Sequence, residues 1–134
     1  YAVNVKGTFF CSRAAARAMR QQGKGCIVNV ASTAGIRPTG SSIAYCASKA
    51  GVISLTGTLA RALGPEIRVN AVAPGFTVTR WNAGRDETRR RVEEAASLRR
   101  AGRPEDIAEV IVGLAAGADY VTGQVVVVDG GWLL

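Results

Sequence analysis

Tyr45 and Lys49 are four residues apart in a segment with the composition of a helix. Residues at this spacing share one helix face, about one turn apart. A free phenol titrates near pH 10, so only about one in a thousand is ionised at neutral pH. An ammonium about 4 Å away contributes roughly 4 kcal/mol at an effective dielectric near 20, which lowers the phenol pKa by at most about three pH units because desolvation opposes it. The pair is a candidate for general acid–base chemistry.

Ser32 places a hydroxyl directly after an apolar, β-branched run at residues 26–31. Ligands of open α/β sheets bind beyond the carboxyl ends of such strands. The sequence has no histidine, which excludes Ser-His-Asp and Cys-His nucleophiles. An odd number of cysteines without CxxC spacing argues against a disulfide framework or a zinc site, and no metal is expected; the three are Cys11, Cys26 and Cys46.

The elements that must position these residues alternate along the chain. The apolar pattern and the Gly and Pro signals predict helices at 1–22, 44–63 and 104–116 and strands at 26–31, 67–72 and 125–128. The strands are continuously apolar, which is typical of a parallel sheet covered by helices on both faces. The predicted fold class is therefore α/β, with a loop at 32–42 between the Ser32 strand and the Tyr45 helix.

Length and composition fit one partial domain, residues 1–134. Apolar residues make up 48% and charged residues 20% of the 134 residues, as in globular proteins. No apolar run reaches the 18 or so residues of a membrane span, and the first ten residues lack the pattern of a signal peptide. Free thiols fit a reducing cytoplasm, so a cytoplasmic protein without a membrane partner is expected. The chain starts inside a predicted helix and its first strand keeps an unpaired edge, so we expect upstream residues to be missing.

Basic residues are concentrated in one part of the chain. The net charge is +7, and residues 80–103 contain eight arginines against four acidic residues. Two interpretations remain open: a solvated helical face, or a patch for an anionic partner. This segment has a single aromatic residue, Trp81, and no recognised binding motif, so no nucleic-acid partner is expected.

Several motifs in order resemble the short-chain dehydrogenase/reductase family. They are Asn29-Val-Ala-Ser32, Tyr45-Cys-Ala-Ser-Lys49, Arg68-Val-Asn-Ala-Val-Ala-Pro-Gly75 and Val128-Asp-Gly-Gly131, with the family's 13-residue step from Ser32 to Tyr45. Asn4 matches the asparagine in the helix before the serine strand. The resemblance covers essentially all of the chain and is strongest to 3-oxoacyl-carrier-protein reductases. It implies a Rossmann-like fold of which this chain is the catalytic C-terminal half, with the N-terminal half missing.

The resemblance also implies roles for the catalytic residues. Tyr45 gives a proton to the carbonyl oxygen as hydride arrives from the nicotinamide, and Lys49 lowers the Tyr45 pKa and holds the ribose hydroxyls. Ser32 hydrogen-bonds the substrate oxygen. Asn4 holds a water through its helix backbone and connects Lys49 to solvent. In the alternative interpretation, Ser32 only caps the loop and Asn4 is an ordinary helix residue.

The cofactor implied by the resemblance is NADP or NAD. Beyond Tyr45 and Lys49, its nicotinamide would be bordered by four residues, with a main-chain contact at the third: Pro74, Gly75, Thr77 and Thr79. Thr79 is alternatively a plain turn hydroxyl. The residue that selects between the two cofactors follows the second strand of the family's first half, which this sequence does not contain.

The implied activity is hydride transfer between a nicotinamide and a ketone or secondary alcohol, with a carrier-linked 3-oxoacyl thioester as the expected substrate. Alternatives are a reductase of another small ketone, sugar or polyol, or an inactive interaction module. The helices at 1–22 and 44–63 resemble those that pair across the family's main two-fold, which implies a homo-oligomer, in this family a homotetramer. One departure is large: no Thr-Gly-x-x-x-Gly-x-Gly turn follows a strand here. Either the sequence is part of a protein about twice as long, or the chain is inactive alone.

Overall fold

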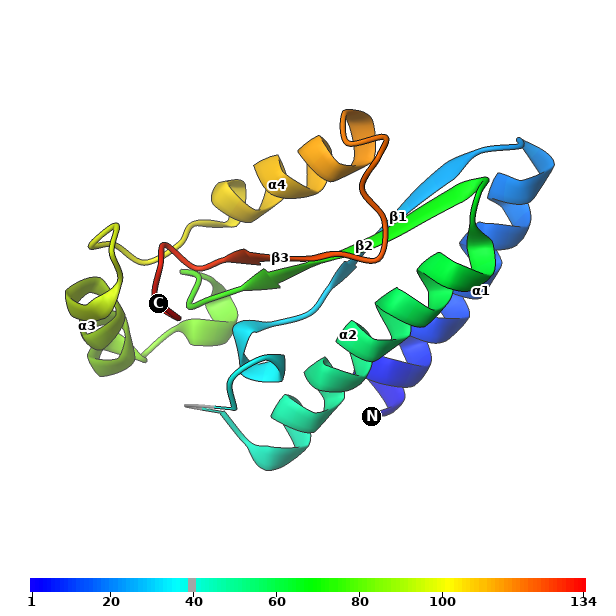
Figure 1. Cartoon of the computed structure of the whole chain (residues 1–134). Coiled ribbons are helices and arrows are strands. Elements are labelled where there is room, and N and C mark those ends of the chain that lie inside the picture. The colour runs from blue at the N-terminus through cyan, green and yellow to red at the C-terminus, as the bar shows by residue number, and fades with distance from the viewer. Residues whose placement is uncertain (39–40) are drawn as a thin grey trace.

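A parallel three-stranded sheet forms the centre of the molecule (Figure 1). The computed structural model describes residues 1–38 and 41–134. The strands are β1 (Gly25–Val30), β2 (Ile67–Pro74) and β3 (Val125–Val128), in the order β1-β2-β3. Both strand pairs are parallel, which confirms the predicted sheet. β2 runs two residues beyond the predicted end because Ala73 and Pro74 still pair with β3.

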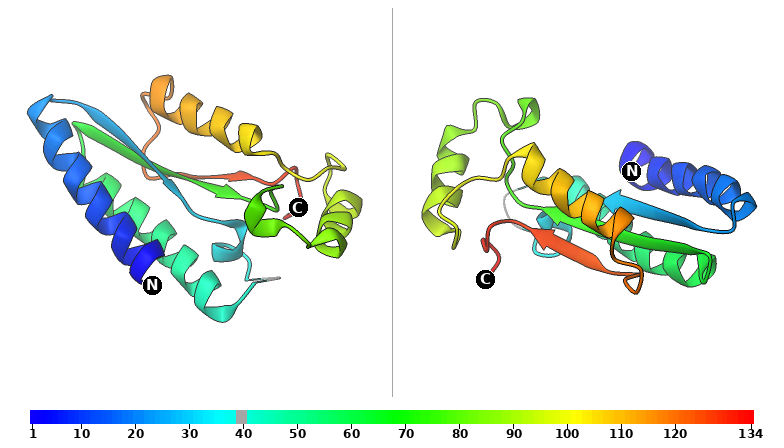
Figure 2. Two further views of the ribbon diagram at one scale, coloured as in Figure 1. Left: turned by 180° about the vertical axis from the view of Figure 1, so that it is seen from behind. Right: turned by 90° about the horizontal axis from the view of Figure 1, so that it is seen from above.

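Helices cover both faces of the sheet, as predicted. α1 (Thr8–Gln21) and α2 (Ile43–Leu63) lie on one face, and α4 (Pro104–Ala116) lies on the other (Figures 1 and 2). The central strand is therefore buried along most of its length, with Val69, Ala71 and Val72 at 0% exposure. A continuously apolar strand is what such a sandwiched position requires.

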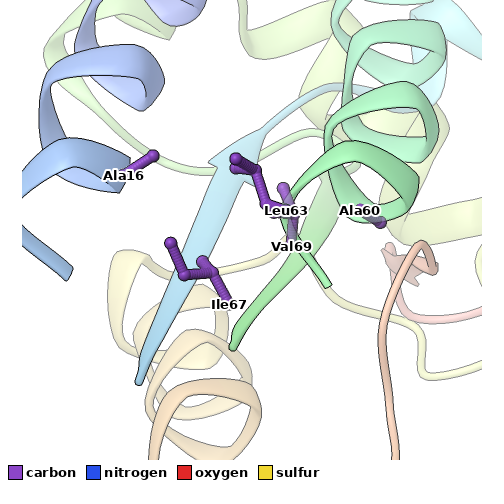
Figure 3. Close-up of a cluster of buried hydrophobic side chains, with 5 residues drawn as sticks. All are labelled: Ala16, Ala60, Leu63, Ile67 and Val69. Carbon is purple, nitrogen blue, oxygen red and sulfur yellow. The ribbon is translucent and has the colours of Figure 1, made fainter. Parts of the chain in front are cut away.

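One core cluster joins the two helices of the first face to β2 (Figure 3). Ala16 of α1 meets Ala60 and Leu63 of α2 over Ile67 and Val69 of β2. Small side chains at the helix positions let both helices approach the strand closely. Burial of this apolar surface, at roughly 25 cal/mol per Å², is what holds α2 against the sheet.

The predicted helix at 1–22 is two elements. Residues Ala2–Gly7 form a π-helical turn, η1, and regular α-helix begins at Thr8. Within η1 the carbonyl of Tyr1 accepts from both Val5 N and Lys6 N. π-helical turns are rare and are found mostly at functional sites. Nothing in the apolar spacing of this segment distinguishes a π turn from an α turn.

The predicted loop after β1 contains a 3₁₀ turn, η2 (Thr33–Gly35), before α2 begins. Two residues of the predicted loop, Thr39 and Gly40, lie outside the described residues. The arginine-rich segment forms a 3₁₀ turn, η3 (Arg80–Asn82), and a helix, α3 (Asp86–Ala95), beyond the carboxyl ends of the strands (Figure 1). No helix in the described part of the chain is long and apolar enough to cross a membrane.

Candidate active site

Tyr45 and Lys49 lie in the first turns of α2, and the Lys49 side chain reaches the carboxyl end of β1. Ser42 is the N-cap of this helix, and its side chain accepts a hydrogen bond from Tyr45 N at 3.3 Å. A Ser cap satisfies one of the free N–H groups at a helix start and so fixes where the helix begins. The Lys49 ammonium lies 5.8 Å from the centre of the Tyr45 ring. The predicted pair is therefore brought together on one helix face.

The Lys49 ammonium is tied to the end of β1. Its Nζ donates to the carbonyl of Val30 at 2.8 Å. Partial burial lowers the pKa of Lys49 below its ordinary value, because desolvation disfavours the charged form. One of the three ammonium hydrogens is used in this bond, which leaves two for a ligand.

Ser32 follows β1 directly and starts η2. Its Oγ accepts from Ala34 N at 3.2 Å, so the capping role considered for this residue is present. The cap uses only a lone pair of the oxygen. No hydrogen bond from the Ser32 O–H to another described residue is seen, so this hydroxyl has a hydrogen to donate. Capping and substrate binding are therefore compatible.

Gly35 brings the Ser32 turn against the backbone of α2. A Cβ built at Gly35 would lie 2.7 Å from the carbonyl carbon of Lys49 and 2.8 Å from Ala50 N. Real Cβ atoms essentially never approach other atoms this closely. Only glycine lets η2 sit at this distance from Lys49, a requirement that sequence reasoning missed.

Asn4 lies in η1, beside the same part of α2. Its side-chain Nδ2 donates to Ser48 Oγ at 2.9 Å, and its carbonyl accepts from Thr8 Oγ1 at 2.6 Å. The structure brings Asn4 next to the Tyr45–Lys49 turn, in agreement with the expected neighbourhood. A water held by its backbone stays a prediction. The Ser48 contact was missed, because a serine inside an Ala-rich helix carries no signal of a distant partner.

The segment 74–79 continues from the carboxyl end of β2. Gly75 N donates to Val128 O, and a Cβ at Gly75 would lie 2.7 Å from the Asp129 Cβ, so this turn packs tightly on the end of β3. Thr77 Oγ1 donates to Gly75 O at 3.2 Å, and the Thr77 carbonyl accepts from a side-chain amide of η3. Thr79 is exposed and begins η3 without a side-chain cap.

The polar residues of β2 have structural roles. Arg68 donates to the carbonyls of Leu114 and Ala115 at the end of α4, at 2.9 and 3.3 Å, and so satisfies groups that a helix terminus leaves free. Asn70 is fully buried, with its amide donating to Val121 O and its carbonyl accepting from Gln124 N. These side chains hold the sheet to its surroundings.

The arginine segment is partly neutralised by its own acids. Arg89 pairs with Glu93 at 2.8 Å and Arg91 pairs with Glu87, both at the helical i,i+4 spacing. Arg100 binds Asp106 through two hydrogen bonds of 2.6 and 2.9 Å. Arg103 also reaches Asp106. Salt bridges with other described residues are absent for four arginines of the segment: Arg80, Arg85, Arg90 and Arg99.

The three cysteines are free, and Cys46 beside Tyr45 is buried. Within residues 1–38 and 41–134, no three His, Cys, Asp or Glu side chains come together in a way that could hold a metal ion. The groups that do come together are a phenol, an ammonium and a hydroxyl. They lie at the carboxyl end of β1, where open α/β sheets bind ligands.

Comparison with known proteins shows which proteins the chain is similar to. Residues 1–133 match the family model described as enoyl-(acyl carrier protein) reductase. The chain is 45% identical to the short-chain dehydrogenase/reductase homolog YusR of Bacillus subtilis, over 97% of this chain and all of YusR. It is 46% identical to the 3-oxoacyl-[acyl-carrier-protein] reductase FabG of Thermotoga maritima, over 98% of this chain and 55% of FabG.

A solved structure gives the same result for the fold. A gluconate 5-dehydrogenase from Burkholderia cenocepacia, in complex with NADP and tartrate, matches with a TM-score of 0.91 at 29% identity. The match covers 98% of this chain and 53% of that protein. The chain thus spans about half the length of FabG and of this dehydrogenase, and the whole of YusR. These shares say how much of each relative is matched, and the assignment of the chain to the C-terminal half stays a prediction.

Proposed function

The chain belongs to the short-chain dehydrogenase/reductase family, and from this premise we propose that it supplies the reacting groups of an oxidoreductase that interconverts a ketone and a secondary alcohol with NADP or NAD. One observation carries the proposal. Lys49 is bonded to the Val30 carbonyl, on the same helix face as Tyr45, while Ser32 begins the turn after the same strand. These positions support a site in which Tyr45 is the acid, Lys49 its electrostatic partner and Ser32 a hydroxyl donor at one strand end.

The residues at this strand end fit the nicotinamide half of the cofactor. Lys49 has two ammonium hydrogens left for ribose hydroxyls, and the turn from Pro74 through Thr79 leaves the neighbouring strand at the same edge. When bound, the cofactor supplies or accepts the hydride. Contacts to its pyrophosphate need a glycine-rich turn between a strand and a helix, and this sequence has none.

The chain's own residues then handle the oxygen and the proton. The Ser32 O–H donates to the substrate oxygen, while the bond from Ala34 N holds Ser32 in place. Tyr45 donates its phenolic proton to that oxygen during reduction and removes the proton during oxidation. The Lys49 ammonium stabilises the phenolate that is left, because opposite charges a few ångströms apart favour the ionised form.

We propose a carrier-linked 3-oxoacyl thioester as the substrate. Two observations support this choice: the 46% identity to a 3-oxoacyl-[acyl-carrier-protein] reductase, and four arginines without an acidic partner in the described segment after β2. Arginine suits phosphate and carboxylate groups. A polyol or sugar acid is the second candidate, supported by the match to a gluconate 5-dehydrogenase.

We also propose that the protein is a cytoplasmic homo-oligomer, in the form of a tetramer. The exposed side of α1 and α2 carries a shallow apolar groove of about 190 Å³ between Phe9, Leu59 and Leu63, rimmed by arginines of α1. Apolar side chains are exposed on both helices, at Phe9 and Phe10 of α1 and Ile43 of α2, and they favour pairing with a second copy.

Replacing Tyr45 by Phe tests the activity. In the complete protein, Tyr45→Phe should lower carbonyl-dependent NAD(P)H oxidation at least about a hundredfold, since general acid–base catalysis contributes at least that much. Cofactor affinity should change little. Tyr120→Phe is the matched control, because Tyr120 is fully exposed at 105% and lies beyond the end of α4. Near-normal turnover in Tyr45→Phe would end the proposed mechanism.

A further inference from the structure

A partly buried hydrogen-bond relay links η1 to the backbone of Tyr45. Asn4 Nδ2 donates to Ser48 Oγ at 2.9 Å, and Ser48 Oγ donates to the Tyr45 carbonyl at 2.8 Å. The hydroxyl has one hydrogen, so donation to Tyr45 obliges Ser48 to accept from Asn4. Ser48 is only 1% exposed. The Ser48 hydroxyl is thus shielded from solvent and depends on Asn4 and Tyr45 for its hydrogen bonds.

We propose that Ser48 is a positioning residue for the reaction, and that it acts together with the side chain of Asn4. This inference rests on the proposed function. It assigns Asn4 a side-chain role in addition to the backbone role that the family resemblance implies. The relay fixes the first turns of α2 relative to η1, and with them the phenol of Tyr45 and the ammonium of Lys49.

The geometry explains why this carbonyl matters. In an α-helix the carbonyl of residue 45 also accepts the N–H of residue 49. The Ser48 bond therefore acts on the carbonyl that already links the backbones of Tyr45 and Lys49 by a hydrogen bond. η1 also packs directly on α2, where a Cβ built at Gly51 would lie 3.0 Å from Val5 Cγ2. Without the relay, η1 and α2 keep this apolar contact but lose the side-chain hydrogen bond that fixes their relative position.

The same helix provides a matched control two turns away. Asn29 Nδ2 donates to Thr56 Oγ1 at 3.0 Å, and Thr56 Oγ1 donates to the Val52 carbonyl at 2.8 Å. Thr56 is 0% exposed. The second relay has the same kinds of donor and is more deeply buried, with Asn29 at 7% exposure. It lies roughly 12 Å farther along α2, at 1.5 Å per residue, and touches neither Tyr45 nor Lys49.

The experiment compares Ser48→Ala with Thr56→Val in the complete protein. Ser48→Ala leaves the half-buried Asn4 amide without its partner, and Thr56→Val leaves the buried Asn29 amide without its partner. Both should lower the melting temperature by about 3–8 °C, and Thr56→Val should do so at least as much as Ser48→Ala. Only Ser48→Ala should lower kcat, by about 5- to 20-fold, with little change in KM, because sub-ångström displacement of reacting groups slows chemistry. Asn4→Ala, at a half-buried position that tolerates the change, should give a similar loss. The double variant should lose no more than the larger single loss.

Hydrogen exchange separates the relay from the activity. Ser48→Ala should speed exchange of the Val5 and Lys6 amides at least about fivefold, because both bond to Tyr1 O inside η1. Thr56→Val should leave these amides unchanged. Equal kcat losses in Ser48→Ala and Thr56→Val, or additive losses in the double variant, would overturn the positioning role. Unchanged exchange in η1 of Ser48→Ala would overturn the relay, whether or not the protein is active. Absence of carbonyl reduction in the wild-type protein would instead contradict the proposed function.

Discussion

Replacing Gly35 by Ala tests how tightly the Ser32 turn must sit on α2. The added Cβ would start 2.7 Å from the Lys49 carbonyl carbon and 3.0 Å from the Lys49 carbonyl oxygen. Both are backbone atoms, so neither can rotate away. Ordinary contact begins near 3.4 Å. The turn and the helix must therefore separate by about 0.7 Å, and a close-packed interior has no free space to absorb such a displacement.

Two magnitudes follow from that displacement. Overpacking of a filled interior costs about 1–3 kcal/mol, which for a chain of 134 residues corresponds to roughly 3–12 °C in the melting temperature. Misplacement of reacting groups by 1 Å can cost about a hundredfold in rate, so a shift of about 0.7 Å should lower kcat at least tenfold. Ser32 and Lys49 lie on the two sides of the gap that opens.

The measurements are a urea or thermal unfolding curve and steady-state carbonyl reduction. Gly113→Ala in α4 is the control, because a Cβ there meets nothing within 4 Å. Alanine inside a helix is favoured over glycine by about 1 kcal/mol, so this variant should be slightly more stable and fully active. If Gly35→Ala matched Gly113→Ala in both measurements, the close approach of η2 to Lys49 could not be a constraint on the site.

Three further predictions concern charge and assembly. The pKa of Asp106 lies below its ordinary range, chiefly because Arg100 hydrogen-bonds the carboxylate. The stabilising effect of this carboxylate is therefore present above about pH 4 and is lost as the pH falls below that value. Asp106→Asn should flatten the pH dependence of the urea midpoint between about pH 2 and 4. For a phosphorylated carrier substrate, kcat/KM should fall roughly fivefold between 10 and 150 mM salt. Replacing Arg80, Arg85 and Arg90 by Ala should flatten this salt dependence. If a small neutral ketone gave a salt dependence parallel to that of the carrier substrate, the carrier hypothesis would be wrong. Light scattering at micromolar concentration should give a tetramer or at least a dimer, and a monomer would contradict pairing through α1 and α2.

The sheet and its helices were predictable because local signals agreed with the tertiary fold. The run at 26–31 and the run at 125–128 are β-branched and flanked by glycines, and both form strands. Pro104 and the acids after it mark the start of α4, as the structure confirms. The pairing of Arg89 with Glu93 was also accessible from the i,i+4 spacing, although the sequence argument counted only the charges.

Contacts between distant residues could not be predicted in the same way. Asn4 and Ser48 are 44 residues apart, and neither residue type distinguishes a partner from a solvated side chain. Gly35 occupies a loop in which glycine has several ordinary reasons to occur, and its close contact with Lys49 exists only in three dimensions. The π turn η1 is defined by the backbone bonds that Tyr1 O accepts, which the apolar periodicity of the segment does not encode.

The first turns of α2 are held by three different elements within a short stretch. η1 binds Ser48, η2 presses on the backbone at Lys49 and Ala50, and β1 accepts the Lys49 ammonium at Val30. The apolar packing that anchors α2 to the sheet lies farther along the helix, at Val52, Ala60 and Leu63. Polar and steric contacts therefore fix the positions of the reacting groups, while hydrophobic burial holds the helix against the sheet. Because the two sets of contacts are separate, substitutions at the first should reduce turnover more than they reduce stability, and substitutions at the second should do the reverse.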